Sequence, residues 1–166
     1  MVPDRHLAQV NVAFPLAPLD SELLRDFVSQ LAPVNEAADA SPGFVWRPQT
    51  EDGDATAIRA FGDDRLLVNM SVWESLEALR AFVYRSPAHV GVMRRRREWF
   101  DRIGTYLALW WVTAGHRPTV AEAEKRLTLL QAVGPSPDAF TFAHHFAEPG
   151  GGLEAVDDDR WLCPAG

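Results

Sequence analysis

The sequence lacks the features that define several broad classes of protein. Its 166 residues include one cysteine, Cys163, so an internal disulfide cannot form, and this cysteine usage is typical of a reducing compartment. No stretch approaches the ~20 consecutive apolar residues of a membrane-spanning helix, and the N-terminal residues form no apolar run long enough for a signal peptide. These absences predict a cytoplasmic protein that does not enter a membrane.

Positive charge and catalytic motifs are also scarce. The formal net charge of −7 argues against binding to nucleic acid or to an anionic membrane, because phosphate binding needs a positive surface. The sequence contains no G-x-S-x-G, G-x-G-x-x-G, P-loop or zinc-ligand spacing. His144 and His145 are adjacent on a predicted strand, where their side chains oppose each other and cannot hold one metal ion. We therefore expect no metal site.

The composition is that of a globular domain. Apolar residues make up 47% of the chain and charged residues 23%, a balance that permits a substantial buried core. Because domains cluster near ~100–150 residues, we expect one domain over residues 1–149. Residues 150–166 are rich in glycine and aspartate, so we expect a loosely ordered tail there, anchored at Trp161.

Apolar periodicity and capping residues predict the strands and helices. Strands are expected at residues 6–14, 44–49, 56–61, 66–73, 106–112 and 139–146. A first helix is expected to begin at Asp20 or Ser21, to kink at Pro33 and to end before Gly43. Three further helices are expected: one capped by Ser75, one that begins with Ser86 and Pro87 and ends near residue 103, and one from residue 119 to 133.

This order of elements predicts an α+β fold with an antiparallel sheet and helices on one face. The other face of the sheet needs a cover, because some of its side chains are too apolar for water and others are too polar for a dry core. The apolar ones are Leu67, Leu109 and Trp111, and the polar ones are Asn11, Asn69 and Ser71. A second subunit that packs sheet to sheet around a partly polar cavity meets both demands, so we expect a homodimer.

Four arginines follow one another in the stretch RSPAHVGVMRRRREWF, residues 85–100. Successive helical residues turn by about 100°, so four consecutive arginines cannot all share one solvated face. A single, mainly apolar helical face is formed by His89, Met93, Arg96, Phe100 and Ile103. We therefore expect His89 and Arg96 to point inward and the other three arginines to lean toward solvent.

Two interpretations of the inward arginine remain open. An unpaired buried charge costs on the order of several kcal/mol, so Arg96 needs partners. It either pairs with a nearby acid, Glu98 or Glu74, and clamps the helix to the sheet, or it shares a cavity with His89 and meets an anionic or carbonyl group of a ligand. His89 is likewise either a hydrogen-bonded structural histidine or a functional one.

Several blocks of the sequence resemble a known family. The blocks are LAQVNVAF, ASPGFVWR, NMSVWESLEALRAFVYRSPAH, RRRREWF, LWWVTAGHRPT and GPSPDAFTF, and they occur in order from about residue 7 to residue 142. Together they resemble a bacterial family catalogued as a domain of unknown function. That family is similar to the dimeric α/β-barrel superfamily, which includes antibiotic-biosynthesis-monooxygenase-like and spheroidene-monooxygenase-like proteins. The resemblance implies a ferredoxin-like domain that forms a face-to-face dimer, and it implies no reaction of its own.

The leading hypothesis is a small-molecule protein with an apolar cavity between sheet and helices. Its reactive groups would be His89 and Arg96, and its substrate-binding residues are predicted to be Asn11, Asn69, Ser71, Trp73 and Trp111. Trp46 is a further aromatic that could line such a pocket. If the protein is an enzyme, the resemblance implies oxidation of an aromatic or polyketide-like substrate without a bound cofactor. His89 would then take a substrate proton while the amides hold a developing oxyanion.

Two alternatives belong to other classes. The first is a haem protein in which His89 is the axial ligand and Arg96 pairs with a propionate. The second is a dimeric binding protein without enzymatic activity, whose pocket is filled by structural side chains. No other cofactor is expected.

Overall fold

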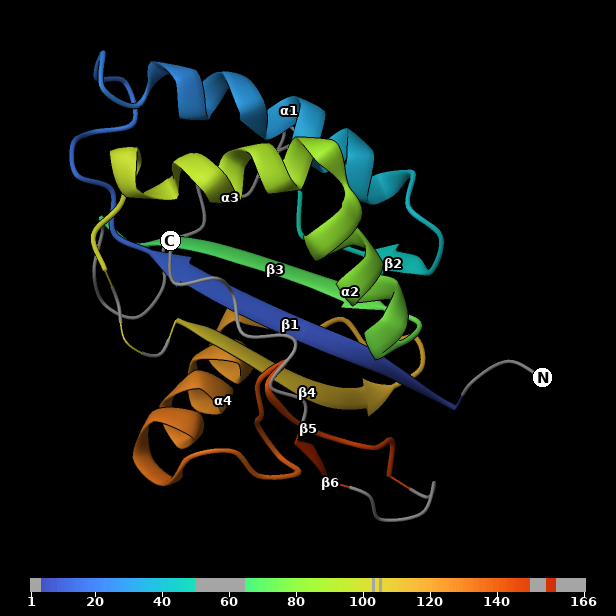
Figure 1. Ribbon diagram of the computed structural model, residues 1–166. Coiled ribbons are helices and arrows are strands. Elements are labelled where there is room, and N and C mark those ends of the chain that lie inside the picture. Colours follow the sequence, from blue (N-terminus) through green and yellow to red (C-terminus); the bar gives the residue numbers. More distant parts are fainter. Residues whose placement is uncertain (1–3, 50–64, 103, 105, 150–154, 158–166) are drawn as a thin grey trace.

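The computed structural model describes residues 4–49, 65–102, 104, 106–149 and 155–157. The strand expected at residues 56–61 lies outside these ranges. The elements are β1 (Arg5–Ala13), α1 (Arg25–Asp39), β2 (Phe44–Trp46), β3 (Leu67–Trp73), α2 (Leu76–Arg85), α3 (Pro87–Trp99), β4 (Leu107–Thr113), α4 (Val120–Val133), β5 (His144–Phe146) and β6 (Ala155–Asp157), and Figure 1 shows their arrangement.

The main sheet has four strands in the order β2-β3-β1-β4, and every neighbouring pair is antiparallel. The first two strands in sequence, β1 and β2, are separated in space by β3, the arrangement of a split β-α-β unit. With α1 between β1 and β2, and with α2 and α3 between β3 and β4, this is the ferredoxin-like topology. The predicted α+β class and antiparallel ferredoxin-like sheet are therefore confirmed.

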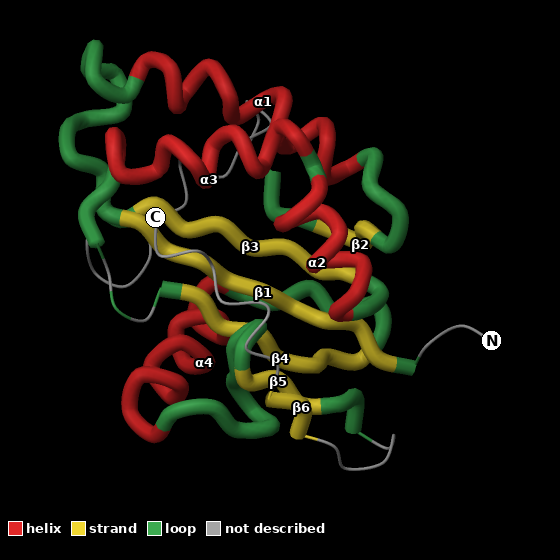
Figure 2. Tube along the Cα trace, in the orientation of Figure 1, coloured by secondary structure: helices red, strands yellow, loops and turns green. Residues whose placement is uncertain are grey.

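Helices lie on both faces of the sheet. Successive side chains of a strand point to opposite faces. On one face, Val10 and Val12 of β1 form a core with Leu127 and Leu130 of α4. On the other face, Leu7 and Trp73 pack with side chains of α1 and α2, and α3 covers the same face (Figures 1 and 2). Thus α1, α2 and α3 share one face, as predicted, whereas α4, which was expected on that face too, covers the opposite one.

The polar side chains of the sheet lie on the face that α1, α2 and α3 cover. Asn11, Asn69 and Ser71 line a space between sheet and helices. The expectation that these side chains lie on a face without helices was wrong, because α1, α2 and α3 lie on that face, while the homodimer stays a prediction. The error arose because the alternation of side chains along a strand shows which residues share a face, but it does not show which face the helices cover.

Two helix ends differ from the predicted ones. The residue before α1 is Leu24, which makes no side-chain capping bond, whereas Asp20 and Ser21 lie in turns further upstream. The helix then continues through Pro33 to Asp39. The third helix, α3, stops at Trp99, and Phe100 is already extended. The predicted extension of this helix to residue 103 was therefore wrong.

Three other helix starts are confirmed. The Ser75 hydroxyl accepts a hydrogen bond from the Ala78 amide at the start of α2, and the Thr119 hydroxyl accepts one from the Glu122 amide at the start of α4. Pro87 opens α3 after Ser86, as predicted. Ser75 and Thr119 each accept a hydrogen bond from an amide that a helix start leaves without a partner. Pro87 has no amide hydrogen, so it leaves no such group.

The last predicted strand is much shorter than expected. Of residues 139–146, β5 contains His144–Phe146, which pairs with β6. Phe140 joins the main sheet through one isolated bridge to Leu109 of β4. Phe140 and Phe142 are buried, whereas His144 is exposed. The apolar alternation thus reflects burial against β4 rather than one continuous strand.

Candidate functional site

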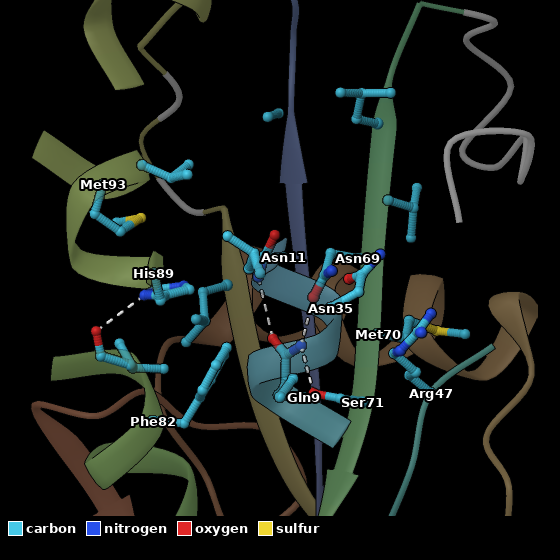
Figure 3. Close-up of a pocket in the computed structure, with 18 of the residues that line it drawn as sticks. Gln9, Asn11, Asn35, Arg47, Asn69, Met70, Ser71, Phe82, His89 and Met93 are labelled. Atoms are coloured by element: carbon cyan, nitrogen blue, oxygen red, sulfur yellow. Dashed lines mark hydrogen bonds between the residues drawn. The ribbon is translucent and has the colours of Figure 1, made fainter. Parts of the chain in front are cut away.

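A cavity of about 220 Å³ lies between the sheet and the helices α1, α2 and α3. Its floor is formed by the face of β1 and β3 that carries Gln9, Asn11, Asn69 and Ser71. The opposite wall comes from α1 and α3, and Figure 3 shows His89 and Met93 of α3 across the cavity from the strand residues. The lining is mostly apolar, with a small number of polar groups gathered on the sheet. This composition is typical of a small-molecule site.

The polar groups form one hydrogen-bonded network centred on Gln9. Its Nε2 donates to Asn69 Oδ1 and to Ser71 Oγ, each at 2.9 Å, and its Oε1 accepts from Asn11 Nδ2 at 3.3 Å. Ser71 Oγ accepts a second bond, from Trp73 Nε1, at 2.8 Å. Gln9 is 5% exposed, so its amide is held by protein partners rather than by water. Both amide hydrogens of Gln9 are used.

The network leaves defined hydrogen-bonding capacity for a ligand. Ser71 Oγ accepts two bonds, so its own hydrogen remains available to donate. Within the described chain, Asn69 Nδ2 makes no hydrogen bond and can donate, and Asn11 Oδ1 makes none and can accept. Figure 3 places Asn35 of α1 beside Asn11 and Asn69. The cavity therefore offers donors and one acceptor on a rigid strand surface.

His89 has a fixed orientation and tautomer. Its Nδ1 lies 2.9 Å from the backbone oxygen of Val83, and because a carbonyl oxygen can only accept, Nδ1 carries the hydrogen. Burial lowers the pKa of His89 below its usual 6.5, and the hydrogen bond to Val83 opposes part of that shift. A neutral imidazole with hydrogen on Nδ1 has its lone pair on Nε2. That lone pair can accept a proton from a bound molecule.

The carbonyl of Val83 is available because of Pro87. In a continuous helix the amide of residue 87 would bond to it, but proline has no N–H. Proline also disfavours helical geometry at the residue before it, and Ser86 is extended. Val83, in the last turn of α2, therefore has a backbone oxygen that His89, in the first turn of α3, can bind. The ring of His89 also packs against Phe82, with centroids 5.0 Å apart.

Arg96 is the inward member of the arginine run, as predicted. It lines the cavity half-buried, while Arg94, Arg95 and Arg97 are exposed. Its guanidinium carbon lies 4.5 Å from the centre of the Tyr106 ring, a cation–π contact. The suggested ion pair with Glu98 was wrong, because Glu98 binds Arg95 at 2.9 Å. The clamp to an acid is thus absent among the described residues.

The cavity brings together six of the seven predicted site residues: Asn11, Asn69, Ser71, Trp73, His89 and Arg96. The exception is Trp111, which points to β5, where its Nε1 donates to the Phe146 oxygen at 2.9 Å. Trp46 packs against the core on the opposite face of the sheet. Of the three predicted tryptophans, Trp73 lines the cavity, where it contacts Phe44 and Phe82, and Trp46 and Trp111 lie elsewhere.

Several polar lining residues were not predicted, among them Gln9, Asn35 and Arg47. Gln9 could have been found, since it alternates with Asn11 on the same strand face. Asn35 and Arg47 also line the cavity, but they come from α1 and from the segment after β2, whose orientation toward the sheet depends on packing. Arg47 binds Asp39, with Nε 2.8 Å from Oδ1. No local pattern in the sequence distinguishes these two from solvent-facing residues.

The remaining histidines have structural surroundings. His116 Nε2 lies 2.7 Å from Glu122 Oε2, and Trp110 Nε1 donates to the other oxygen of Glu122 at 3.0 Å, which ties the end of β4 to α4. His145 is buried, with Nδ1 3.2 Å from the Phe142 oxygen. No group of three or more His, Cys, Asp or Glu side chains suited to a metal ion occurs within the described ranges.

The residues around His89 do not fit a haem. The cavity volume of about 220 Å³ is below the ~300–1,000 Å³ of pockets that enclose drug-sized ligands, and a haem is larger still. Phe82 also packs against the imidazole. The arrangement favours a ligand that is smaller than a haem.

Fold and cavity together define a ferredoxin-like α+β domain with a small, partly polar chamber beneath its helices. Residues 6–155 match the domain of unknown function DUF3291, and the chain belongs to that family. This confirms the predicted membership of a family of unknown function. No curated protein sequence is similar enough to this chain to count as a match.

Several solved structures are similar to this chain at low identity. SnoaB, a cofactor-independent oxygenase from Streptomyces nogalater, is 19% identical, with 68% of this chain and 95% of SnoaB covered and a TM-score of 0.44. Rv0793 from Mycobacterium tuberculosis is 15% identical, with 69% and 99% covered and a TM-score of 0.47. A proposed antibiotic biosynthesis monooxygenase from Chloroflexus aurantiacus is 13% identical, with 69% and 98% covered and a TM-score of 0.43.

No helix in the described segments is both long enough and apolar enough to cross a membrane.

Proposed function

We propose that the cavity binds a small aromatic molecule and that His89 removes a proton from it. One observation carries this proposal: the imidazole is held by the Val83 carbonyl at 2.9 Å, with its basic Nε2 free, opposite a network of amides and a hydroxyl. A neutral histidine, fixed in one tautomer inside an apolar chamber, has the properties of a general base. A purely structural histidine would not need a hydrogen-bonding surface across the cavity from it.

The strand residues would stabilise the charge that proton removal creates. Asn69 Nδ2 and the Ser71 hydroxyl have hydrogens to donate, so a substrate oxygen between them would gain negative charge at low cost. Gln9 holds both side chains in place. Because these donors are already positioned before substrate binds, little reorganisation is needed during the reaction.

We further propose that the activated substrate reacts with dioxygen without a bound cofactor, as the resemblance to monooxygenase-like proteins implies. A methylene carbon between two rings would lose a proton to His89, and the resulting carbanion would add O₂ to give a hydroperoxide. Loss of water then leaves a carbonyl group, so CH₂ and O₂ become C=O and H₂O. The substrate loses four electrons, and the dioxygen gains four.

The test uses 1,8-dihydroxyanthrone, whose central methylene is acidic, and follows oxygen uptake and the absorbance of the quinone product. We expect the protein to accelerate this oxidation over buffer, and we expect His89→Gln to remove the acceleration. His116→Gln is the matched control, because His116 is bound to Glu122 away from the cavity. Failure of the wild-type protein to accelerate oxidation would favour the binding protein without enzymatic activity.

The assembly and location predicted from the sequence are part of the same proposal. The protein would act as a homodimer in the cytoplasm, with the cavity of each subunit formed by its own chain. Its partners would be a second copy and a small aromatic ligand.

A further inference from the structure

The cavity contains a positive charge that no carboxylate of the described residues neutralises. Its described lining includes three basic residues, Arg47, His89 and Arg96, and no aspartate or glutamate. Asp39 neutralises Arg47 through two contacts, at 2.8 and 3.1 Å. No carboxylate among the described residues pairs with Arg96. In a chain with a net charge of −7, the chamber beneath the helices is therefore positively charged.

Arg96 and His89 lie at opposite ends of the cavity. His89 packs on Phe82, and Phe82 stacks on Trp73, which places the imidazole at the Ser71 end. Arg96 lies over Tyr106, whose backbone oxygen accepts from the Val12 amide at the far end of β1. Seven helical residues separate the two side chains, a rise of roughly 10 Å. The rest of the lining is mostly apolar, and its amides come from the strand floor and from Gln30 and Asn35 of α1.

The guanidinium of Arg96 has unused capacity for an anion. The ring face of Tyr106 attracts the guanidinium cation, but it accepts no hydrogen bond from the N–H groups that lie in the guanidinium plane. A guanidinium prefers a carboxylate, to which it donates two parallel hydrogen bonds. An apolar environment strengthens such a pair, since water competes less for either partner.

We propose that the ligand is a fused-ring aromatic acid whose carboxylate binds Arg96 and whose acidic methylene, for which a hydroxyl stands in the probes below, faces His89 at the opposite end. This inference rests on the proposed function and specifies its substrate class. The rings lie along the apolar lining between the two ends. Arg96 determines specificity, and His89 receives the proton.

Three two-ring probes separate the two ends of such a ligand. 6-Hydroxy-2-naphthoate carries both groups, 2-naphthoate carries the carboxylate alone, and 2-naphthol carries the hydroxyl alone. Binding is measured at pH 7 by calorimetry. Because Arg96 would donate hydrogen bonds to a charged carboxylate, the two probes that carry one should bind roughly tenfold to a hundredfold more tightly than 2-naphthol. Equal affinity of the three probes, or binding of none, would overturn the proposal.

Substitution of Arg96 tests the assignment. Arg96→Met is expected to abolish the preference for carboxylates while retaining the binding of 2-naphthol, which also shows that the variant is folded. Arg96→Lys keeps the charge and should retain part of the preference. Arg94→Met, on the exposed side of the same helix, is the matched control and should bind all three probes as the wild type does. A carboxylate preference that survives in Arg96→Met would overturn the proposal.

The proposed function can fail independently of this inference. The hydroxyl of 6-hydroxy-2-naphthoate should donate a hydrogen bond to Nε2 of His89, so His89→Phe should weaken the binding of this probe more than that of 2-naphthoate. A carboxylate preference that depends on Arg96, without any such effect of His89→Phe, would support Arg96 as the anion site and contradict His89 as the base.

Discussion

One backbone oxygen decides what His89 can do. The Val83 carbonyl takes the Nδ1 hydrogen at 2.9 Å, so the lone pair must lie on Nε2. A carboxylate in the same place would also orient the ring, but it would stabilise the protonated imidazole and raise its pKa. With a neutral carbonyl as the partner, burial has the larger effect, and the pKa of His89 falls. The residue is therefore a base that is unprotonated near neutral pH.

This lowered pKa predicts how stability depends on pH. Between the lowered pKa of the folded protein and the usual 6.5 of the unfolded chain, the unfolded state binds more protons. His89 should therefore reduce the free energy of unfolding as the pH falls below about 6.5, and turnover should decrease as its imidazole becomes protonated. Urea unfolding at several pH values, compared with His89→Gln, isolates this contribution. Parallel pH profiles for the two proteins would show that the pKa of His89 is not lowered.

Gln9 should contribute more to stability than the residues it binds. Gln9→Met leaves the Asn69 oxygen and the Asn11 amide without their partner and takes one donor from Ser71. Loss of one member of a buried hydrogen-bonded group costs about 1–3 kcal/mol of unfolding free energy. Asn69→Ala is the matched comparison and should cost less, because Asn69 is exposed to solvent. Chemical denaturation measures both, and a larger loss for Asn69→Ala would contradict a central role for Gln9.

The site residues were predictable where the spacing of residues along a strand or a helix shows which side chains share a face. Alternation along strands identified Asn11, Asn69 and Ser71, and helical spacing identified His89 and Arg96. The partner of His89 was not predictable, because every residue has a backbone carbonyl and the sequence does not show which one is free. Trp111 failed for a related reason: its strand face is shared with the site, but its indole bonds to the segment that follows.

At the scale of elements, the junction of α2 and α3 controls the site. Pro87→Ala restores an amide hydrogen and removes the restriction on Ser86, so residue 87 can compete for the Val83 oxygen. Since the hydrogen bond to Val83 raises the pKa of His89, its loss should lower that pKa further. NMR titration of the imidazole measures the change. Pro135→Ala, in an exposed turn, is the control, and an unchanged titration in Pro87→Ala would show that Pro87 does not position His89.

The ends of elements were predictable where a local contact sets them. Ser75 and Thr119 bond to amides three residues later, a signal that lies within four residues of sequence. By contrast, Leu24 precedes α1 without any capping side chain, and its burial against Phe27 and Trp99 is tertiary. The short β5 has the same explanation, because Phe140 is held by β4 rather than by its neighbours in sequence.

At the scale of the whole molecule, charge is separated between surface and interior. The chain carries a net charge of −7, and yet the described cavity lining has arginine and histidine and no acid. The exposed arginines of α3 are partly offset at the surface, where Arg95 binds Asp26 and Glu98. The acidic exterior repels anions at long range, while salt screens that repulsion beyond about 10 Å. An anionic ligand therefore gains its affinity within the cavity rather than from steering.

The proposed homodimer makes a prediction that separates assembly from the site. Because α1, α2 and α3 of the same chain line the cavity together with Asn11, Asn69 and Ser71, the proposed site needs no residue from a second subunit. Light scattering during size exclusion should give twice the 18.5 kDa chain mass, and Asn69→Ala and Arg96→Met should leave that mass unchanged while altering ligand binding. A mass of 18.5 kDa across a wide concentration range would contradict the dimer. Dissociation caused by either substitution would instead place the subunit interface at the cavity.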